Sequence, residues 1–490
     1  MLKNLFVNKI NLLKWTGTIL FSSVVVTNEA MAISIDWTGG YRVEYVSVTN
    51  PSLADSQSKN YALNFLYLKP TIIGSDGIHI VSRFDVMSNG TPAYKNSQVG
   101  SLIGTGLNEG SSGNGSTASS QNQNASNLLI SQLYLNVNHE YGSFLVGRTP
   151  IDFGLGITHN AGRNPFDHWM DTKELIAYRF TVDNISFSPM IARVKQNDFG
   201  GGIANDQIFL FEYNNKDIGA KAGVFHQTRS LSSGNNDLLG TEVGSGTVTT
   251  TGANALGAKV QTVNIYLERL WPSFEFKLEA SFLTGDSGVL RTEGEVKYNA
   301  WAVVSEMKMP ASDSKWEWSG QLGAVSGDNS ETSTVYEGYQ LDRNYNVGML
   351  MFNHRLGQFD ILKTKAIHAN DTLGGNNLSV GNSVDDEAVS NVFFLAPALN
   401  YKWDEKVDLK TKFVYAQLLN SKFSNGTSTF DSSSDLGYEL NFELNYKPRE
   451  RVTWSTGLGL LLPGSAWSGG DSNFDKKISY GLETKAAITF

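Results

Sequence analysis

The chain of 490 residues contains no cysteine, which excludes disulfides, thiolate metal sites and cysteine nucleophiles. Its formal net charge of −9 argues against nonspecific binding of nucleic acid. Beyond residue 32 no uninterrupted apolar run is long enough to cross a bilayer as a helix, so a membrane-spanning form of this chain must be a β-barrel.

Residues 1–32 have the pattern of a cleaved signal peptide. Three lysines are followed by an apolar stretch, Trp15–Val26, and by the small-residue motif Ala30-Met31-Ala32. A transmembrane anchor is the alternative, but the apolar stretch is short and a cleavage motif follows it. We expect the mature chain to begin near Ile33.

Segments of alternating apolar and polar residues predict an all-β fold, an antiparallel transmembrane barrel over residues 33–490. Because successive side chains of a strand point to opposite faces, one face suits lipid and the other water. We expect about eighteen strands. They lie at residues 35–47, 61–73, 78–88, 128–138, 143–152, 175–182, 185–196, 206–213, 218–229, 259–270, 274–284, 295–307, 315–326, 389–402, 407–419, 436–447, 451–462 and 478–490.

Short and long connections alternate between these strands. Those after even-numbered strands are short, such as Gly74–Gly77 and Pro448–Glu450, whereas those after odd-numbered strands are mostly long and polar, such as residues 89–127. Bacterial barrels place short turns in the periplasm and long loops outside, so both termini are expected on the periplasmic side. Residues 327–388 contain the apolar segment Asn346–Phe352, which predicts either a loop folded into the pore or an additional hairpin. We favour the folded-in loop.

The last predicted strand, Ile478–Phe490, alternates throughout and ends on an aromatic residue. Such a terminus is characteristic of Gram-negative outer-membrane barrels, where it resembles the signal read by the barrel-insertion machinery. To close the sheet, this strand must pair with the first strand around Trp37–Tyr45.

The alternation predicts a charged, water-filled lumen, because so many charges cannot lie unpaired in a dry core. Arg193 and Lys195 point inward only if Pro189 produces a bulge. Arginines gather on the early strands and carboxylates on the late ones. We therefore expect Arg42, Arg83 and Arg179 to favour anions, unless the charges pair across the lumen and brace the wall. The predicted inward residues are Arg42, Glu44, Arg83, Asp85, Arg179, Glu275, Lys277, Glu279, Lys410, Lys412, Glu439, Glu443, Glu483 and Lys485.

Most tryptophans are expected to be interfacial anchors, whereas Tyr266 and Trp301 are expected to face inward, where they would contact a ring-shaped solute. His159 and His168 share a loop with three aspartates, Asp152, Asp167 and Asp171. This loop is the one candidate for a small metal or acid-base site, but it lacks a recognised ligand spacing.

Two stretches resemble the alginate-export family of outer-membrane porins. They are Leu436–Trp467, with Gly-x-Glu-Leu and a later Pro-Gly loop, and Val146–Gly154 followed by Arg163–Asp167. The resemblance covers about a fifth of the chain. It implies an eighteen-stranded monomeric barrel with an arginine-rich constriction, and it adds Arg148 and Arg163 to the pore-lining candidates. The alternation of faces leaves the orientation of the Arg148 side chain undecided, because the apolar Phe144 and Val146 lie on the same side of the strand unless Pro150 distorts it.

The sequence thus predicts an outer-membrane porin for small polar or anionic solutes such as sugars, organic acids or anionic saccharides. We expect no enzymatic activity and no cofactor, and the expected partners are outer-membrane lipid, lipopolysaccharide, the insertion machinery and the solutes. An outer-membrane barrel enzyme or a surface adhesin is the alternative.

Overall fold

The structure is a computed structural model, and it describes twelve segments of the chain. The expected signal peptide, residues 1–32, and most of the polar loop at 89–127 lie outside them. The described segments are residues 34–54, 58–86, 100–103, 128–196, 203–231, 257–291, 294–310, 314–328, 334–354, 356–357, 387–424 and 429–490.

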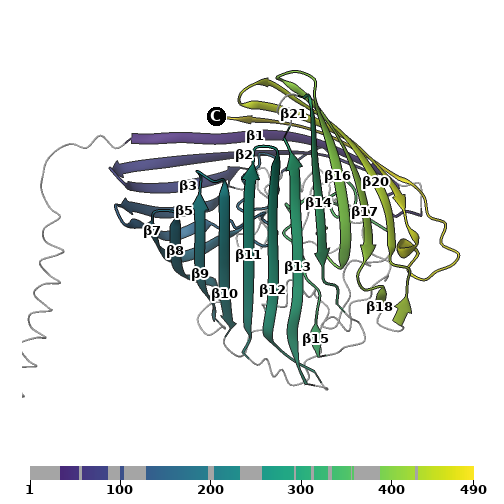
Figure 1. The fold of residues 1–490 in the computed structure, drawn as a ribbon, viewed down its shortest axis with the longest axis horizontal. Coiled ribbons are helices and arrows are strands. Elements are labelled where there is room, and N and C mark those ends of the chain that lie inside the picture. Colours follow the sequence, from purple (N-terminus) through teal and green to yellow (C-terminus); the bar gives the residue numbers. More distant parts are fainter. Residues whose placement is uncertain are drawn as a thin grey trace, which may run out of the picture.

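Within these segments, eighteen long strands form one closed antiparallel barrel (Figure 1), which confirms the predicted fold class and strand count. Two short strands, β4 (Gly100–Ile103) and β15 (Val335–Tyr336), also pair with this sheet, and β18 (Lys422–Ser424) and β19 (Thr429–Asp431) form a separate hairpin. The barrel strands are β1 (Ser34–Thr49), β2 (Ser58–Ser75), β3 (Ile78–Val86), β5 (Leu128–His139), β6 (Gly142–Pro150), β7 (Thr172–Val182), β8 (Ile185–Gln196), β9 (Ile203–Asn215), β10 (Ala220–Leu231), β11 (Lys259–Trp271), β12 (Phe274–Arg291), β13 (Gly294–Met309), β14 (Trp316–Val325), β16 (Val392–Lys402), β17 (Val407–Leu418), β20 (Asp435–Arg449), β21 (Val452–Pro463) and β22 (Ser479–Thr489).

The barrel closes where β1 pairs with β22, in a register that runs from Gly40 opposite Thr489 to Thr49 opposite Tyr480. Beyond the last pair, the Phe490 N–H donates to the Gly39 carbonyl at 3.0 Å, and the Gly39 N–H donates back at 2.8 Å. A Cβ at Gly39 would lie 2.6 Å from the Phe490 ring, so only glycine admits this close approach. Closure leaves neither β1 nor β22 as an unpaired edge.

Large apolar side chains cover the outside of the barrel. On β22, Tyr480, Leu482 and Ile488 are exposed, whereas Ala487 on the opposite face is buried. Tryptophans are exposed near the strand ends that carry the short turns, namely Trp37, Trp271, Trp316, Trp403 and Trp454. No helix in the described ranges is long and apolar enough to span a membrane. The 3₁₀ helix η1, Ser465–Ser468, precedes β22.

Two connections enter the barrel. The first inner loop, residues 151–171, joins β6 to β7, and the second inner loop, residues 334–354 and 356–357, lies between β14 and β16. β14 pairs directly with β16, from Trp316 opposite Tyr401 to Val325 opposite Val392, so no additional hairpin separates these strands.

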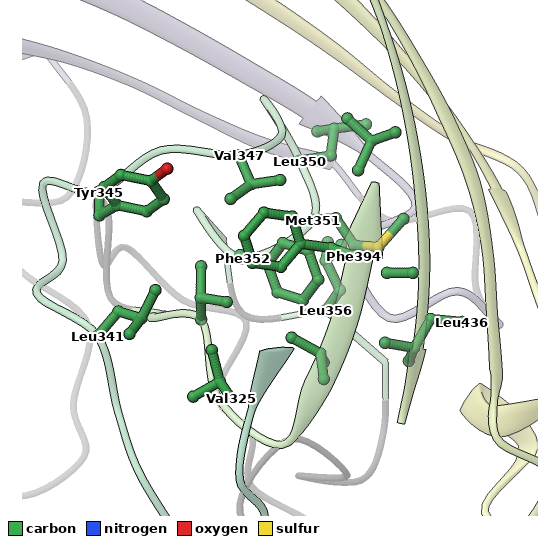
Figure 2. Packing of buried hydrophobic residues seen from close by; sticks show 14 of the residues in the cluster. Val325, Leu341, Tyr345, Val347, Leu350, Met351, Phe352, Leu356, Phe394 and Leu436 are labelled. Carbon is green, nitrogen blue, oxygen red and sulfur yellow. The ribbon is translucent and has the colours of Figure 1, made fainter. Parts of the chain in front are cut away.

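The second inner loop carries the largest apolar cluster into the barrel (Figure 2). Leu350 and Met351 are fully buried, and they belong to one cluster with Val325, Phe394 and Leu436 of the wall. Burying a side chain of this size contributes roughly 1.5–3 kcal/mol. Apolar burial therefore explains why Asn346–Phe352 does not lie free in solvent.

Candidate pore and its lining

The first inner loop crosses the lumen. Near its start, the Phe153 ring packs on Phe225 of β10 and Tyr266 of β11, with centroids 5.6 and 6.3 Å apart. Near its end, His168 contacts Glu44 of β1. In a closed ring of eighteen strands, β10 and β11 lie on the side opposite β1. The loop therefore spans the barrel from wall to wall.

Arg42, Glu44 and His168 form a buried charged cluster at the β1 end of this loop. Arg42 Nε lies 2.8 Å from Glu44 Oε1, and His168 Nε2 lies 2.9 Å from both Glu44 oxygens. Arg42 Nη1 also donates to the backbone carbonyls of Pro165 and Asp167. Arg42 is only 3% exposed, so its charge fastens the loop to the wall and does not face water.

Burial also shifts the ionisation of two groups in the first inner loop. It lowers the pKa of His168 below its ordinary value, against the pull of Glu44. It raises the pKa of Asp167 to about 6, although the Asn164 N–H and Arg42 favour the carboxylate. At neutral pH we therefore treat His168 as a neutral ring that donates its Nε2–H to Glu44.

Arg83 and Asp85 repeat this arrangement on β3. Arg83 Nε lies 2.8 Å from Asp85 Oδ1, its Nη1 contacts the Met170 sulfur at 3.3 Å, and its guanidinium lies 4.4 Å from the centre of the Tyr67 ring. Both charged side chains are buried. We refer to β1–β3 with these two pairs as the arginine wall.

Two fully buried carboxylates hold the inner loops by their backbone. Glu279 of β12 accepts the Leu155 N–H at 2.6 Å. Glu439 of β20 accepts three successive N–H groups, those of Met349 and Leu350 at one oxygen and that of Met351 at the other, at 2.6–2.9 Å. Glu439, predicted to line the pore, is thus covered by the second inner loop.

The two inner loops also bind each other. The Trp169 N–H donates to the Asn344 side chain at 3.0 Å, and the Asn344 amide donates back to the Trp169 carbonyl at 2.8 Å. The Arg343 guanidinium lies 4.5 Å from the centre of the Trp169 ring. Because each loop fixes the other, they form one constriction.

A cavity of about 450 Å³ lies between the loops and the wall formed by β12–β22. We call this side the lysine wall. Asn164 of the first loop and Asn346, Val347, Gly348, Met349 and Asn353 of the second loop line it from within. The charged residues of the lining are Glu275, Lys277, Glu306, Lys308, Lys410, Lys412, Glu443, Glu483 and Lys485.

The lysines of this cavity differ in how they are held. Lys412 donates to Gln321 at 2.9 Å and to the Val347 carbonyl at 3.0 Å, and Lys485 pairs with Glu483 at 3.0 Å. Lys277 and Lys410 have no hydrogen bond and no ion pair within 4 Å among the described residues. These two ammonium groups are the ones available to a solute.

Three other predicted pore residues lie apart from the cavity. Arg163, in the first inner loop, is 77% exposed and contacts Asp152 at 3.0 Å. Arg179 of β7 pairs with Glu212 at 2.8 Å, and both side chains are well exposed. Lys195 pairs through its backbone with Ala204, but its side chain lies outside the described part of the chain.

The predictions that Arg148 and Arg193 line the pore are wrong. Pairing continues without a shift through Pro150 and through Pro189, so neither proline reverses the faces. Arg148 therefore shares the outer face with Phe144, and Arg193 shares it with Ile191, which is 67% exposed.

The inward assignment of Trp301 is also wrong. This tryptophan is exposed on the face of β13 that carries Met307 and Met309, whereas Tyr266 is buried on the inner face as expected. Glu306 and Lys308, which were not among the predicted pore residues, line the cavity from β13. They alternate with the two methionines, and that alternation was the signal that locates them.

These features define a transmembrane β-barrel of the outer-membrane type. The eighteen long strands of the described residues close into one sheet, large apolar side chains cover most of its outer face, and the lumen is charged. A polar composition is compatible with a membrane only in this arrangement.

Comparisons with solved structures return outer-membrane proteins. The crystal structure of Pseudomonas aeruginosa OccK9 (OpdG) aligns at 9% identity and a TM-score of 0.49, over 93% of this chain and 99% of that one. OccK5 (OpdH) of the same organism aligns at 10% identity and 0.46, over 93% and 98%. A BenF-like porin from Pseudomonas fluorescens Pf-5 aligns at 9% and 0.47, over 93% and 99%. No protein-family model and no curated protein matches the chain.

Proposed function

We propose that this protein is a diffusion channel of the Gram-negative outer membrane for small polar or anionic solutes. The observation that carries the proposal is the cavity of about 450 Å³ at the constriction, which Lys277 and Lys410 line without a hydrogen bond or an ion pair within 4 Å among the described residues, although Glu306 and Glu443 lie opposite them on the neighbouring strands. Unpaired ammonium groups in a narrow pore attract anions without holding them tightly.

This proposal assigns the preference for anions to lysines, whereas the sequence predicted that Arg42, Arg83 and Arg179 favour anions. Arg42 and Arg83 are buried in ion pairs, so they contribute little field to the water-filled path. Lys277 and Lys410 lie on β12 and β17 and face the same cavity from two parts of the lysine wall. Selectivity should therefore depend on these lysines.

Planar-bilayer recording tests the channel directly. We expect stable conductance steps and a reversal potential that favours anions in a salt gradient. Replacing Lys277→Gln and Lys410→Gln together should shift the reversal potential toward cations. The matched control is the double variant Arg148→Gln and Arg193→Gln, which removes the same number of cations from the outer face and should leave the potential unchanged. An electrically silent protein would contradict the channel, and equal shifts in both double variants would contradict the role of the lysines.

An enzymatic role is less favoured by the arrangement of the two candidate histidines. His168 Nε2 is directed at the buried Glu44, and the His159 ring packs against Phe225 with centroids 4.6 Å apart. Neither geometry presents a free base to a solute. We extend the proposal to a monomeric porin related to the alginate-export family, on the strength of the sequence resemblance at Leu436–Trp467 and Val146–Gly154.

A further inference from the structure

A row of charged side chains crosses the outer face of the barrel on three neighbouring strands. Arg148 of β6 lies opposite Glu174 of β7, and Glu174 lies opposite Arg193 of β8. We call these three residues the rim row. They share the outer face with Ile176 and Ile191, which are 58% and 67% exposed. A charged row on a face that otherwise meets lipid needs a partner.

The contacts within the rim row hold the arginines in place. Arg148 Nη2 pairs with Glu174, and its Nη1 donates to the Ile130 carbonyl at 3.1 Å. Arg193 Nε lies 3.5 Å from the Asn205 side-chain oxygen. The Arg148 and Glu174 side chains are 30% and 57% exposed, so both remain accessible from outside. In this row, two guanidinium groups flank one carboxylate on adjacent strands.

The height of the rim row follows from counting outward positions. From the short turn before β8, these positions are Ile185, Phe187, Pro189 and Ile191, and Arg193 is the next. Five outward positions span about 26 Å along a strand, which at a tilt of roughly 40° corresponds to a height of about 20 Å along the barrel axis. The apolar band of such barrels is about 25 Å tall and the strands are tilted.

The opposite part of the barrel gives the same height. On β20 the outward positions run from Tyr446 at the end with short turns to the exposed Tyr438, again five positions. Aromatic residues mark both edges of the apolar band in outer-membrane barrels. The rim row therefore lies a few ångströms inside the outer edge of the band, close enough for the long arginine side chains to reach the headgroups of the outer leaflet.

We propose that the rim row binds a phosphate group of lipopolysaccharide in the outer leaflet. The planar guanidinium group matches phosphate with two parallel hydrogen bonds and is readily desolvated. Arg148 and Arg193 flank Glu174 on adjacent strands, so a lipid phosphate would contact both guanidinium groups. Glu174 positions Arg148 and at the same time competes with the phosphate for it.

The test is a titration of the folded barrel in detergent, with bound lipid counted by native mass spectrometry. Two probes are compared, bisphosphorylated lipid A and the same lipid A with both phosphates removed. The double variant Arg148→Gln and Arg193→Gln should bind the phosphorylated lipid A more weakly by roughly threefold to tenfold, the effect of exposed charge contacts. Binding of the dephosphorylated form should not change.

The matched control is Arg269→Gln. Arg269 also lies on the outer face, but at the end of β11 with the short turns, 5.5 Å from the Trp271 ring. It should leave both affinities unchanged. Glu174→Gln removes the competing carboxylate and should strengthen binding of the phosphorylated form by a few-fold. A misfolded variant cannot produce such a gain.

Equal binding of the two lipid A forms, or equal affinities of the parent protein and the double variant, would overturn the proposal. A loss of binding in Glu174→Gln would also overturn it, because the carboxylate would then be part of the site and not its competitor. The variants lie outside the lumen, so their channel conductance should match that of the parent protein, and failure here leaves the proposed channel untouched.

Discussion

The arginine wall and the lysine wall both carry cations that face inward, but the cations of the two walls have different roles. On the arginine wall, Arg42 and Arg83 each pair with an acid two residues further along, on the same strand and the same face. On the lysine wall, Lys277 and Lys410 also have an acid two residues away on their own strand face, Glu279 and Asp408. These acids bind the Leu155 N–H and the Asn445 amide, and neither lysine forms a hydrogen bond or an ion pair within 4 Å among the described residues. The first set holds the constriction in place, and the second faces the solute path.

This difference between the two walls shows that the alternation of faces predicts which side chains point into the lumen but does not predict their roles. A cation with an acid at the second position beyond it on the same strand has a partner about 6.6 Å away along the backbone, within reach of both side chains. If a loop then covers the pair, water is excluded and the charges become structural. Lys277 and Glu279 have the same spacing on β12 without forming a pair, so the spacing alone does not indicate bracing. What distinguishes Arg42 and Arg83 is that their ion pairs are buried.

The largest effect is expected from Glu44→Gln, which removes the carboxylate shared by Arg42 and His168. Removing one partner of a buried ion pair costs about 3–5 kcal/mol, because the remaining charge is left buried without compensation. Urea unfolding of the refolded barrel in detergent measures this loss. Glu483→Gln is the control, since its pair with Lys485 is partly exposed and should be worth about 1 kcal/mol or less. Equal losses of unfolding free energy in the two variants would contradict the distinction between the arginine wall and the lysine wall.

The next effect concerns pH and the second inner loop. Burial lowers the pKa of His354 to about 3, with Lys59 and His168 adding to the shift, whereas in the unfolded chain the ring titrates near 6.5. Below pH 6.5 the unfolded state binds a proton that the folded state excludes, so stability falls as the pH falls. We expect a loss on the order of 3 kcal/mol between pH 6.5 and 4. Unfolding curves at the two pH values measure it.

Asp167 in the first inner loop should act in the opposite direction and must be controlled. Its pKa of about 6 lies above the unfolded value, so the folded state binds the additional proton and this group favours folding as the pH falls from 6 to 4. His354→Phe in an Asp167→Asn background should therefore show a flatter pH dependence than Asp167→Asn alone. An unchanged slope would mean that the loop around His354 already admits water.

Much of the fold was predictable because lipid and water impose a period of two on every strand. The eighteen strands, their closure through β22 and the inward faces of Lys410 and Glu443 all follow from this alternation. Arg148 was assigned to the pore by the family resemblance and Arg193 by a bulge expected at Pro189, and each assignment required a proline to distort its strand. A proline removes one N–H donor from the ladder, but it need not shift the register, and at Pro150 and Pro189 it does not.

The alternation of apolar and polar residues could not predict the roles of Glu279 and Glu439. Each was correctly placed on an inner face, but each binds the backbone of a loop that is distant in sequence, at Leu155 and at Met349–Met351. A strand pattern contains no information about which loop returns to cover it. The apolar segment Asn346–Phe352 indicated that a loop returns, but not the carboxylate that receives it.

The smallest effect is expected from Arg179→Gln, which tests the comparison on an inward-facing ion pair that is exposed to water. Arg179 and Glu212 form an ion pair of 2.8 Å on the inner face, as Arg42 and Glu44 do, but the two side chains are 48% and 36% exposed. A double-mutant cycle with Glu212→Gln should give a coupling of about 0.2–1 kcal/mol at 0.1 M salt, and the coupling should vanish at 1 M salt, where the screening length is about 3 Å. The loss caused by Glu44→Gln should persist at both salt concentrations, because a buried pair is hardly screened. If the two sites respond alike to salt, burial under the first inner loop does not explain why some inward charges stabilise the fold and others face the pore.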